Sequence, residues 1–92
     1  MIRSFRSKKL ERYWWKGDPK RIDPRHVEKI RLQLGHLERA RRPEAMNVAT
    51  WRFHSLRGER RWAVWVDQNW RLTFAWNTDG PDAVDVDYKD YH

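Results

Sequence analysis

Three consecutive residues near the end of the sequence, Asp90, Tyr91 and His92, carry side chains that can exchange protons. A carboxylate or a neutral imidazole accepts a proton, whereas a phenol or an imidazolium donates one. Arg71 adds a permanent positive charge and a planar set of N–H donors, which suit a phosphate group. His54 is a further residue that can accept or donate a proton. These residue types predict acid–base chemistry on an anionic substrate.

One reaction that needs no more than such a set is the metal-free cleavage of RNA. The 2′-hydroxyl of RNA is a built-in nucleophile, so a protein must align it with the adjacent phosphorus, accept its proton and protonate the leaving 5′-oxygen. An arginine offsets the charge of the pentacoordinate transition state. The sequence shows no close set of metal ligands, no glycine-rich phosphate loop and no serine elbow, so we expect no metal and no other cofactor.

Each of these residues also has a plainer interpretation. An arginine on an exposed strand face is more often a solvated charge, and an isolated histidine is usually a surface or structural group. The segment 90–92 could be a loose tail. The residues by themselves therefore leave two classes open, an enzyme acting on RNA and a basic RNA-binding module without catalysis.

Positive charge is concentrated in the first two thirds of the chain. Positions 1–61 contain 18 Lys and Arg against 7 Asp and Glu, whereas positions 62–92 contain 2 against 6. The formal net charge of +7 attracts polyanions such as nucleic acid, although an acidic protein partner would fit as well. Arg57, Arg60 and Arg61 are the candidate RNA- or phosphate-binding residues.

Length and composition favour a single domain over residues 1–92. The absence of cysteine rules out disulfides and thiolate metal sites. No apolar run approaches the length of a membrane span, and the N-terminal segment lacks the apolar stretch of a signal peptide. We therefore expect a soluble cytoplasmic protein without a membrane partner.

Two amphipathic helices are expected in the first half of the chain, after a short strand or lead-in over residues 1–6. Ser7 can cap the first helix and Gly17 can end it. Asp23 and Pro24 predict the start of the second helix, which Pro43 closes.

The apolar periodicity then changes to two, which is typical of strands. Strands are expected over residues 51–55, 62–66, 70–76 and 84–89. Helices that precede a run of strands predict an α+β fold, with the two helices packed on one face of a small antiparallel sheet. Since Trp70 and Leu72 should lie beneath the helices, Arg71 should point to the opposite face, where a ligand can bind.

The seven tryptophans are unusual for a chain of this size. The alternation places Trp70 and Trp76 in the core. Trp14, Trp15 and Trp51 could equally lie in the core or on a surface that stacks on unpaired bases.

Nearly the whole chain, and most strongly the part from His54 onward, resembles the HigB-type toxins of bacterial type II toxin–antitoxin pairs, which belong to the RelE/ParE superfamily. The matching segments are Leu56-Arg57-Gly58, the corner Asn69-Trp70-Arg71 and the terminal Asp90-Tyr91-His92. The opening residues and the overall length also agree. The resemblance implies a RelE-like, microbial-RNase-type fold.

The resemblance also implies a function and partners. The function is that of a ribosome-dependent endoribonuclease, an mRNA interferase that enters the ribosomal A site and cuts the exposed codon. The partners are the 70S ribosome, mRNA and a HigA-type helix-turn-helix antitoxin, with a monomeric free toxin that forms a heteromeric complex. A ParE-like inhibitor of DNA gyrase is the alternative within the superfamily, but that branch lacks the terminal acid–base residues.

Carried over by position, the resemblance assigns catalytic roles to Asp90, Tyr91, His92, Arg71 and His54. Arg71 matches a phosphate-binding strand arginine, and His54 matches a functional histidine before the Leu-Arg-Gly turn. The resemblance leaves open which residue is the general base and which is the general acid.

The chain departs from the family pattern at two places. Arg57 stands where many members have lysine, and Asp67 and Gln68 occupy a region where some members have another basic residue. Fewer phosphate ligands would slow cleavage or change its register. For the proton transfers, a histidine with a pKa of about 6.5 is better matched than Tyr91 at about 10. We expect His92 to be the proton donor, with Asp90 or His54 as the base.

Overall fold

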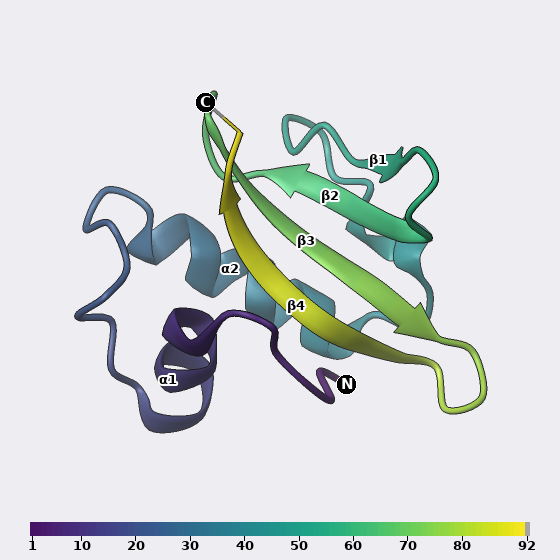
Figure 1. Ribbon diagram of the computed structural model, residues 1–92, viewed down its shortest axis with the longest axis horizontal. Coiled ribbons are helices and arrows are strands. Elements are labelled where there is room, and N and C mark those ends of the chain that lie inside the picture. Colours follow the sequence, from purple (N-terminus) through teal and green to yellow (C-terminus); the bar gives the residue numbers. More distant parts are fainter. Residues whose placement is uncertain (92) are drawn as a thin grey trace.

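The computed structural model describes residues 1–91, and the described chain folds into two α-helices and a four-stranded antiparallel sheet (Figure 1). Their bounds, in chain order, are α1 Lys8–Lys16, α2 Val27–Arg39, the 3₁₀ helix η1 Pro43–Met46, β1 His54–Leu56, β2 Arg61–Trp65, β3 Trp70–Asn77 and β4 Asp82–Asp90. The strands follow one another in the order β1-β2-β3-β4, each antiparallel to its neighbour. The α+β fold predicted from the sequence is confirmed.

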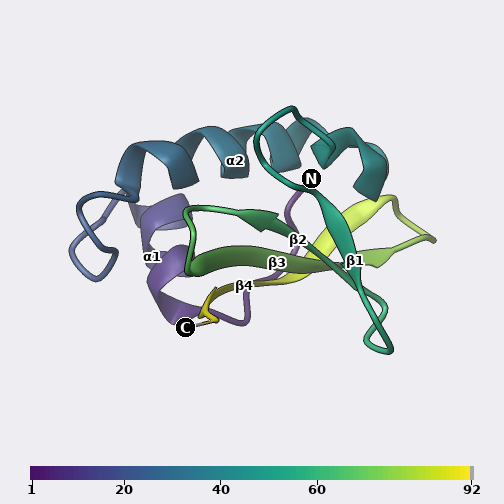
Figure 2. The ribbon, with the colours of Figure 1, turned by 90° about the horizontal axis from the view of Figure 1, so that it is seen from above.

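The helices and the sheet form two layers. Figure 2 shows α2 along one face of the sheet, with α1 beside the edge formed by β4. The core lies between these layers, and its fully buried side chains include Leu10, Ile30, Leu34, Leu37, Val64, Leu72, Phe74 and Val86. Each large apolar side chain removed from water in this way contributes about 1.5–3 kcal/mol to folding. The opposite face of the sheet, here called the open face, is turned toward the viewer in Figure 1.

The first helix forms where the sequence predicts it. Ser7 is its N-cap, and the Ser7 hydroxyl accepts the Leu10 N–H at 3.2 Å. Gly17 ends the helix in a left-handed conformation, with a φ of 69°. The residues before α1 run along β4 and form two isolated parallel bridges, Ile2 with Ala83 and Phe5 with Val86, in place of a continuous strand.

The second helix begins later than predicted. Asp23 does not cap it, because the Asp23 carboxylate closes a turn on the Arg25 N–H at 2.9 Å and also pairs with the Arg25 guanidinium. Residues 24–26 form that turn, and the helix starts at Val27 with His26 as the preceding residue. Pro43 opens the short η1 helix after α2.

The first and last strands also differ from the regular strands that the sequence predicts. Positive φ angles at Thr50 and Arg52 keep the residues after Trp51 out of the sheet, so β1 starts at His54. A bulge in β4 lies opposite the middle of β3, where Asp85 has a φ of 52° and the register shifts between Thr73 and Ala75.

The tryptophans divide between the core and the surface. Trp70 and Trp76 are half-buried against the core, as predicted, and Trp14 and Trp51 pack there too. Trp15 is 53% exposed. Within the described residues, no helix has the length and apolar character needed to cross a membrane.

Candidate active site

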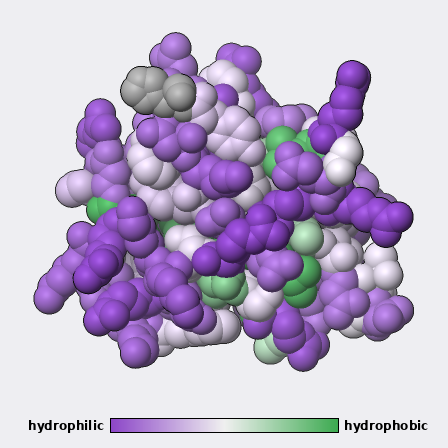
Figure 3. All heavy atoms as spheres, in the orientation of Figure 1, coloured by the Kyte–Doolittle hydropathy of each residue, from purple (hydrophilic) through white to green (hydrophobic). Residues whose placement is uncertain are grey.

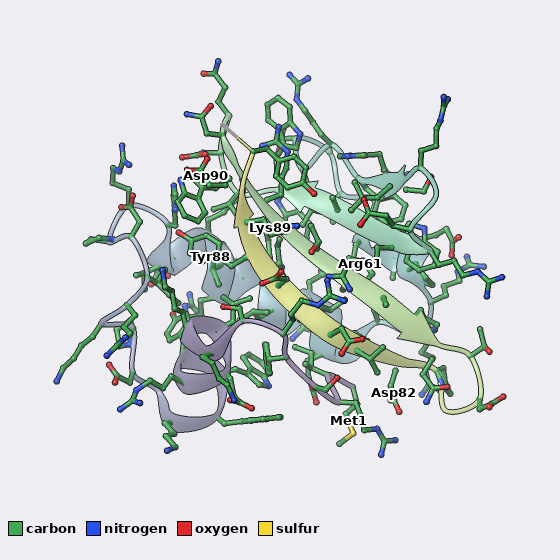
Figure 4. The ribbon with its side chains drawn as sticks, in the orientation of Figure 1. Met1, Arg61, Asp82, Tyr88, Lys89 and Asp90 are labelled. Atoms are coloured by element: carbon green, nitrogen blue, oxygen red, sulfur yellow. The ribbon has the colours of Figure 1, made fainter. Side chains whose placement is uncertain are left out.

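The strand pairing brings several predicted site residues to the open face. Leu72 pairs with Val64 and Tyr88 on the buried side of the sheet. Because side chains alternate along a strand, the next row, formed by Trp65, Arg71 and Lys89, lies on the open face. Figure 4 shows Lys89 on β4 with its side chain on the viewer's side of the sheet.

The Arg71 guanidinium lies over an aromatic ring of the neighbouring strand. The Arg71 guanidinium carbon is 4.1 Å from the centroid of Trp65. Nη1 donates to the backbone carbonyls of Asp67, Gln68 and Trp70 at 2.9, 3.1 and 3.2 Å. Within residues 1–91, Nε and Nη2 make no hydrogen bond, so both remain available to a phosphate.

Burial shifts the titration of Arg71, but the side chain remains a cation. Burial lowers the pKa of the Arg71 guanidinium, while Tyr91 and Asp67 act in the opposite direction. Arginine starts from so high a pKa that it stays charged at neutral pH. The fixed geometry and permanent charge match what anion binding requires.

The end of β4 approaches Arg71. The Tyr91 N–H donates to the backbone carbonyl of Asn69 at 2.8 Å, and the Tyr91 ring lies 5.6 Å from the Arg71 guanidinium carbon. Tyr91 is 47% exposed, and Asp90 is an exposed residue that pairs with Trp70 in the ladder. The predicted catalytic residue His92 lies outside the described residues.

His54 lies on β1, the edge strand of the open face that is farthest from β4. It pairs with Ala63, which in turn pairs with Thr73, so it is two strands and two residues away from Arg71. Strand geometry puts the two Cα atoms roughly 12 Å apart, a distance that two long side chains and one phosphodiester can span. His54 Nδ1 is 2.8 Å from the carbonyl of Arg52, which can accept a proton but has none to donate. In the neutral ring Nδ1 therefore carries the proton, and Nε2 has the free lone pair of a base.

The three predicted RNA-binding arginines do not gather around Arg71. Arg57 is exposed in the turn after β1, and Arg60 borders a hollow beside Trp62. Arg61 is 6% exposed: its Nη2 donates to the Thr73 hydroxyl at 2.7 Å and to the Asp85 carbonyl at 2.8 Å. Figure 4 places Arg61 in the middle of the open face.

Two cations at the site were missed by the sequence analysis. The Arg52 guanidinium carbon is 4.3 Å from the Trp65 centroid, so Arg52 and Arg71 share one ring. Lys89 is exposed beside Arg71, and its Nζ lies 6.0 Å from the Tyr91 ring. Lys89 could have been identified from the sequence, since the two-residue period of a strand places it on the same face as Tyr91. Arg52 could not, because its position depends on a loop with a positive φ.

A second basic surface lies along α1. A hollow of about 810 Å³ there is bordered by the exposed Trp15 and by one acidic residue, Glu11. Its cationic lining consists of Lys8, Lys9, Arg12, Lys16 and Arg21. The face viewed in Figure 3 is covered mostly by hydrophilic side chains, in agreement with the high net charge. We call the basic hollow bordered by these residues of α1 and by Arg21 the α1 hollow.

Comparison with known proteins gives two matches. A family model described as the RelE-like toxin of type II toxin–antitoxin system HigB matches residues 3–92. The curated protein Endoribonuclease HigB from Proteus vulgaris is 32% identical over 94 aligned residues, which cover 100% of both chains.

Proposed function

Because this chain belongs to the HigB-like family of RelE-like toxins, we propose that it is an endoribonuclease that cuts messenger RNA in the ribosomal A site. The relative from Proteus vulgaris, which matches over its whole length, carries the name of an endoribonuclease. The observation that carries the proposal for this chain is the state of Arg71. It is a cation over the Trp65 ring, with Tyr91 beside it, and its Nε and Nη2 make no hydrogen bond to residues 1–91.

The proposed reaction is attack by the 2′-oxygen on the neighbouring phosphorus. The 2′-O–P bond forms, the P–O5′ bond breaks, and the products are a 2′,3′-cyclic phosphate and a free 5′-hydroxyl. Arg71 binds the non-bridging oxygens and offsets the charge that accumulates on them in the transition state. Trp65 holds the guanidinium plane in place through its ring face.

Proton transfer is assigned to groups on different strands. His54 Nε2, on the open face, is the proposed base that takes the proton of the 2′-hydroxyl. Asp90 is the second candidate, but it pairs with Trp70 and so lies on the face opposite Arg71, which favours His54. His92 is the proposed donor to the leaving 5′-oxygen, an assignment made from sequence. Tyr91 is proposed to contact the phosphate or the sugar next to Arg71. A histidine pair of this kind predicts a bell-shaped pH dependence of cleavage.

The ribosome is the proposed presenting partner. A small open face cannot unfold structured RNA, whereas a ribosome presents a codon whose bases are unstacked. The α1 hollow, with five cationic side chains and an exposed tryptophan, has the charge and the aromatic surface suited to ribosomal RNA. Arg57 and Arg60 are exposed and could add phosphate contacts from the turn after β1.

The antitoxin is the second proposed partner. Type II pairs work by a protein antitoxin that binds the toxin, and membership of the HigB-like toxins favours a HigA-type helix-turn-helix protein in this role. Binding would convert a monomeric toxin into a heteromeric complex. Co-expression with the product of a neighbouring gene of that type should restore growth in cells that this protein arrests.

An in vitro translation reaction followed by primer extension tests the function. Wild-type protein should produce cuts within codons when ribosomes are translating and none on the same RNA without ribosomes. Arg71→Ala should abolish the cuts, whereas Arg39→Ala, which removes an exposed arginine from α2, should leave them unchanged. Intact message with both wild type and Arg71→Ala would reject the proposal.

The same samples separate the alternatives. Protein that binds ribosomes or RNA but never cuts would be a binding module. Inhibition of DNA supercoiling by gyrase, without RNA cleavage, would indicate the gyrase-poisoning class. The arrangement around Arg71 supports cleavage, because Arg71, Tyr91 and His54 lie on one face of the sheet.

A further inference from the structure

A buried histidine outside the candidate site joins three elements of the fold. His26 is 3% exposed and precedes α2. Its Nε2 is 2.6 Å from Oδ2 of Asp67, which follows β2, and its Nδ1 is 2.6 Å from the hydroxyl of Tyr88 on β4. The ring also lies beside Trp70, with 5.9 Å between the ring centroids. The proposed reaction uses none of these contacts directly.

The partners are an ionised carboxylate and a protonated hydroxyl, and the carboxylate fixes the direction of its hydrogen bond. The backbone N–H groups of Trp70 and Asn69, together with His26, outweigh the effect of burial and hold the pKa of Asp67 below its usual value. Asp67 is therefore an ionised acceptor, and His26 Nε2 donates to it. Burial raises the pKa of Tyr88 to about 12, so its hydroxyl stays protonated at neutral pH and forms a hydrogen bond with Nδ1. Both ring nitrogens of His26 therefore have a hydrogen-bond partner.

Asp67 connects His26 to the turn between β2 and β3 through further hydrogen bonds. The other carboxylate oxygen of Asp67 accepts the N–H groups of Asn69 and Trp70, at 2.9 and 2.8 Å. The backbone carbonyl of Asp67 accepts from Nη1 of Arg71 at 2.9 Å, and the carbonyl of Asn69 accepts the Tyr91 N–H at 2.8 Å. The turn 67–70 thus holds both the phosphate-binding arginine and the backbone of Tyr91.

We propose that His26 is a positioning residue that fixes Arg71 and Tyr91 through Asp67. The inference rests on the proposed function, because it assigns His26 a part in that reaction. Arg71 is held by carbonyls of a short turn at the end of the sheet, and His26 anchors that turn to the helix layer. Tyr88 fixes the ring from the other side, two residues before Asp90.

The expected effect is on the rate of cleavage more than on binding. A phosphate is attracted by a cation even when the cation is displaced, whereas in-line attack requires it at a set place. Displacement of a catalytic group by about 1 Å can reduce the rate about 100-fold. Loss of the anchor should therefore lower kcat, with KM nearly unchanged.

A matched pair of histidines provides the test. His36 lies on α2, the helix that His26 precedes, and also makes a side-chain hydrogen bond, from Nε2 to the Ala45 carbonyl at 2.9 Å, but its ring contacts Trp51. His26→Phe should lower kcat about 30-fold at a temperature where the variant is folded. His36→Phe should lower the thermal midpoint while keeping kcat within about twofold of wild type.

Two further variants test the same link between His26 and Asp67 if His26→Phe folds poorly. His26→Gln retains a donor for Asp67 and should keep kcat within about threefold. Asp67→Ala removes the same link from the other side and should lower kcat about as much as His26→Phe. Combined in one chain, the two substitutions should cost no more than either one, since both break one connection.

The NMR signal of the Arg71 Nε–H reports the positioning without any cleavage. It should shift or broaden in His26→Phe and Asp67→Ala, and stay in place in His36→Phe. An unchanged signal, or an equal fall in kcat in His36→Phe, would overturn the positioning role. A shifted signal in a protein whose wild type never cuts RNA would instead overturn the proposed function and leave the structural link standing.

Discussion

Arg61 and Arg71 stand on neighbouring strands of the same sheet face but are in opposite states. Arg61 is 6% exposed and donates to the Thr73 hydroxyl and the Asp85 carbonyl, with Nη1 buried and without a partner among the described residues. Arg71 is half-buried, rests on Trp65 and engages one nitrogen with the turn before it. We call Arg61 the enclosed arginine, because its guanidinium is buried in the sheet, and Arg71 the presented arginine, because its guanidinium is accessible to a ligand.

The difference shows that a shared face does not imply a shared role. Burial lowers the pKa of Arg61, as it does that of Arg71, so the shift does not separate them. What separates them is where the donors point: those of Arg61 reach the β4 bulge, whereas Nε and Nη2 of Arg71 are unengaged within residues 1–91. A ligand can reach Arg71 without displacing a strand.

The largest expected effect follows from removal of the presented arginine. Arg71→Ala should reduce ribosome-dependent cleavage about 100- to 1,000-fold, because a donor aimed at developing charge is worth that much in a transition state. Unfolding free energy should change by about 1 kcal/mol, since the lost contacts are a cation–π contact and hydrogen bonds to backbone carbonyls of a turn that is only partly buried. Primer extension and urea unfolding on the same preparations measure the two quantities.

Arg71→Lys sharpens this prediction. Lysine keeps the charge but lacks the planar fork, so cleavage should fall to a level between wild type and Arg71→Ala. If Arg71→Ala cuts at the wild-type rate, Arg71 is a solvated charge and the contrast with Arg61 has no functional meaning.

Removal of the enclosed arginine should affect stability instead. Arg61→Ala should lower the free energy of unfolding by about 2–3 kcal/mol, because it opens a cavity and leaves the Thr73 hydroxyl and the Asp85 carbonyl without their donor. Cleavage by the folded fraction should stay within about threefold of wild type. Chemical unfolding followed by tryptophan fluorescence measures the loss.

Arg61→Met provides the matched control. Methionine fills a similar volume without a buried charge, so it should recover at least half of the lost stability. A variant at position 61 that is fully stable yet no longer cuts RNA would show that Arg61 binds phosphate, as the sequence analysis proposed.

The sequence could predict the sheet face of Arg71, but not the surroundings of either arginine. Alternation along β3 correctly placed Arg71 opposite Leu72, because a two-residue period is a local property of the strand. The enclosure of Arg61 depends on a bulge at Asp85, which brings a carbonyl from β4 toward β2. Such a contact joins positions 24 residues apart, and no local pattern encodes it.

The candidate site shows the same limit. Residue types and the resemblance to HigB-type toxins predicted Arg71, His54 and the acidic–aromatic end of the chain as site residues, and these assignments stay predictions. They missed His26, which has no distinguishing pattern in the sequence and lies just before α2 in the structure. The expected helix start at Asp23 hid it further, because that boundary would have placed His26 in the first turn of a surface helix. Its importance comes from three segments that meet in space.

A smaller effect is expected from the ring beneath Arg71. Trp65→Leu removes the surface on which Arg71 and Arg52 both lie. A cation–π contact is worth about 1 kcal/mol, so cleavage should fall about 5- to 10-fold. Trp62→Leu, on the buried side of the same strand, should lower stability instead and leave kcat within about twofold. Equal loss of kcat in both variants would indicate general damage to the sheet.

The smallest expected effect concerns pH and the turn that holds Arg71. The pKa of Asp67 lies below its usual value in the folded protein, so its ionised form favours folding. That contribution is complete above the pKa of the unfolded chain, about 3.9, and is lost as the pH falls through the lower folded value. Because the Asp67 side chain is 39% exposed, solvent screening limits the contribution to under about 1 kcal/mol.

Asp67→Asn isolates this contribution from those of other carboxylates. Asp18, Asp23 and Asp82 also have lowered pKa values, and they act equally in wild type and variant. Unfolding free energies at pH 6 and pH 3 should therefore differ more for wild type than for Asp67→Asn. The same substitution at position 82 would change the acid response through Arg3, at the opposite end of β4, without affecting cleavage. If Asp67→Asn and wild type lose stability in parallel, the carboxylate does not anchor the turn, and the difference between the enclosed and the presented arginine must come from Trp65 instead.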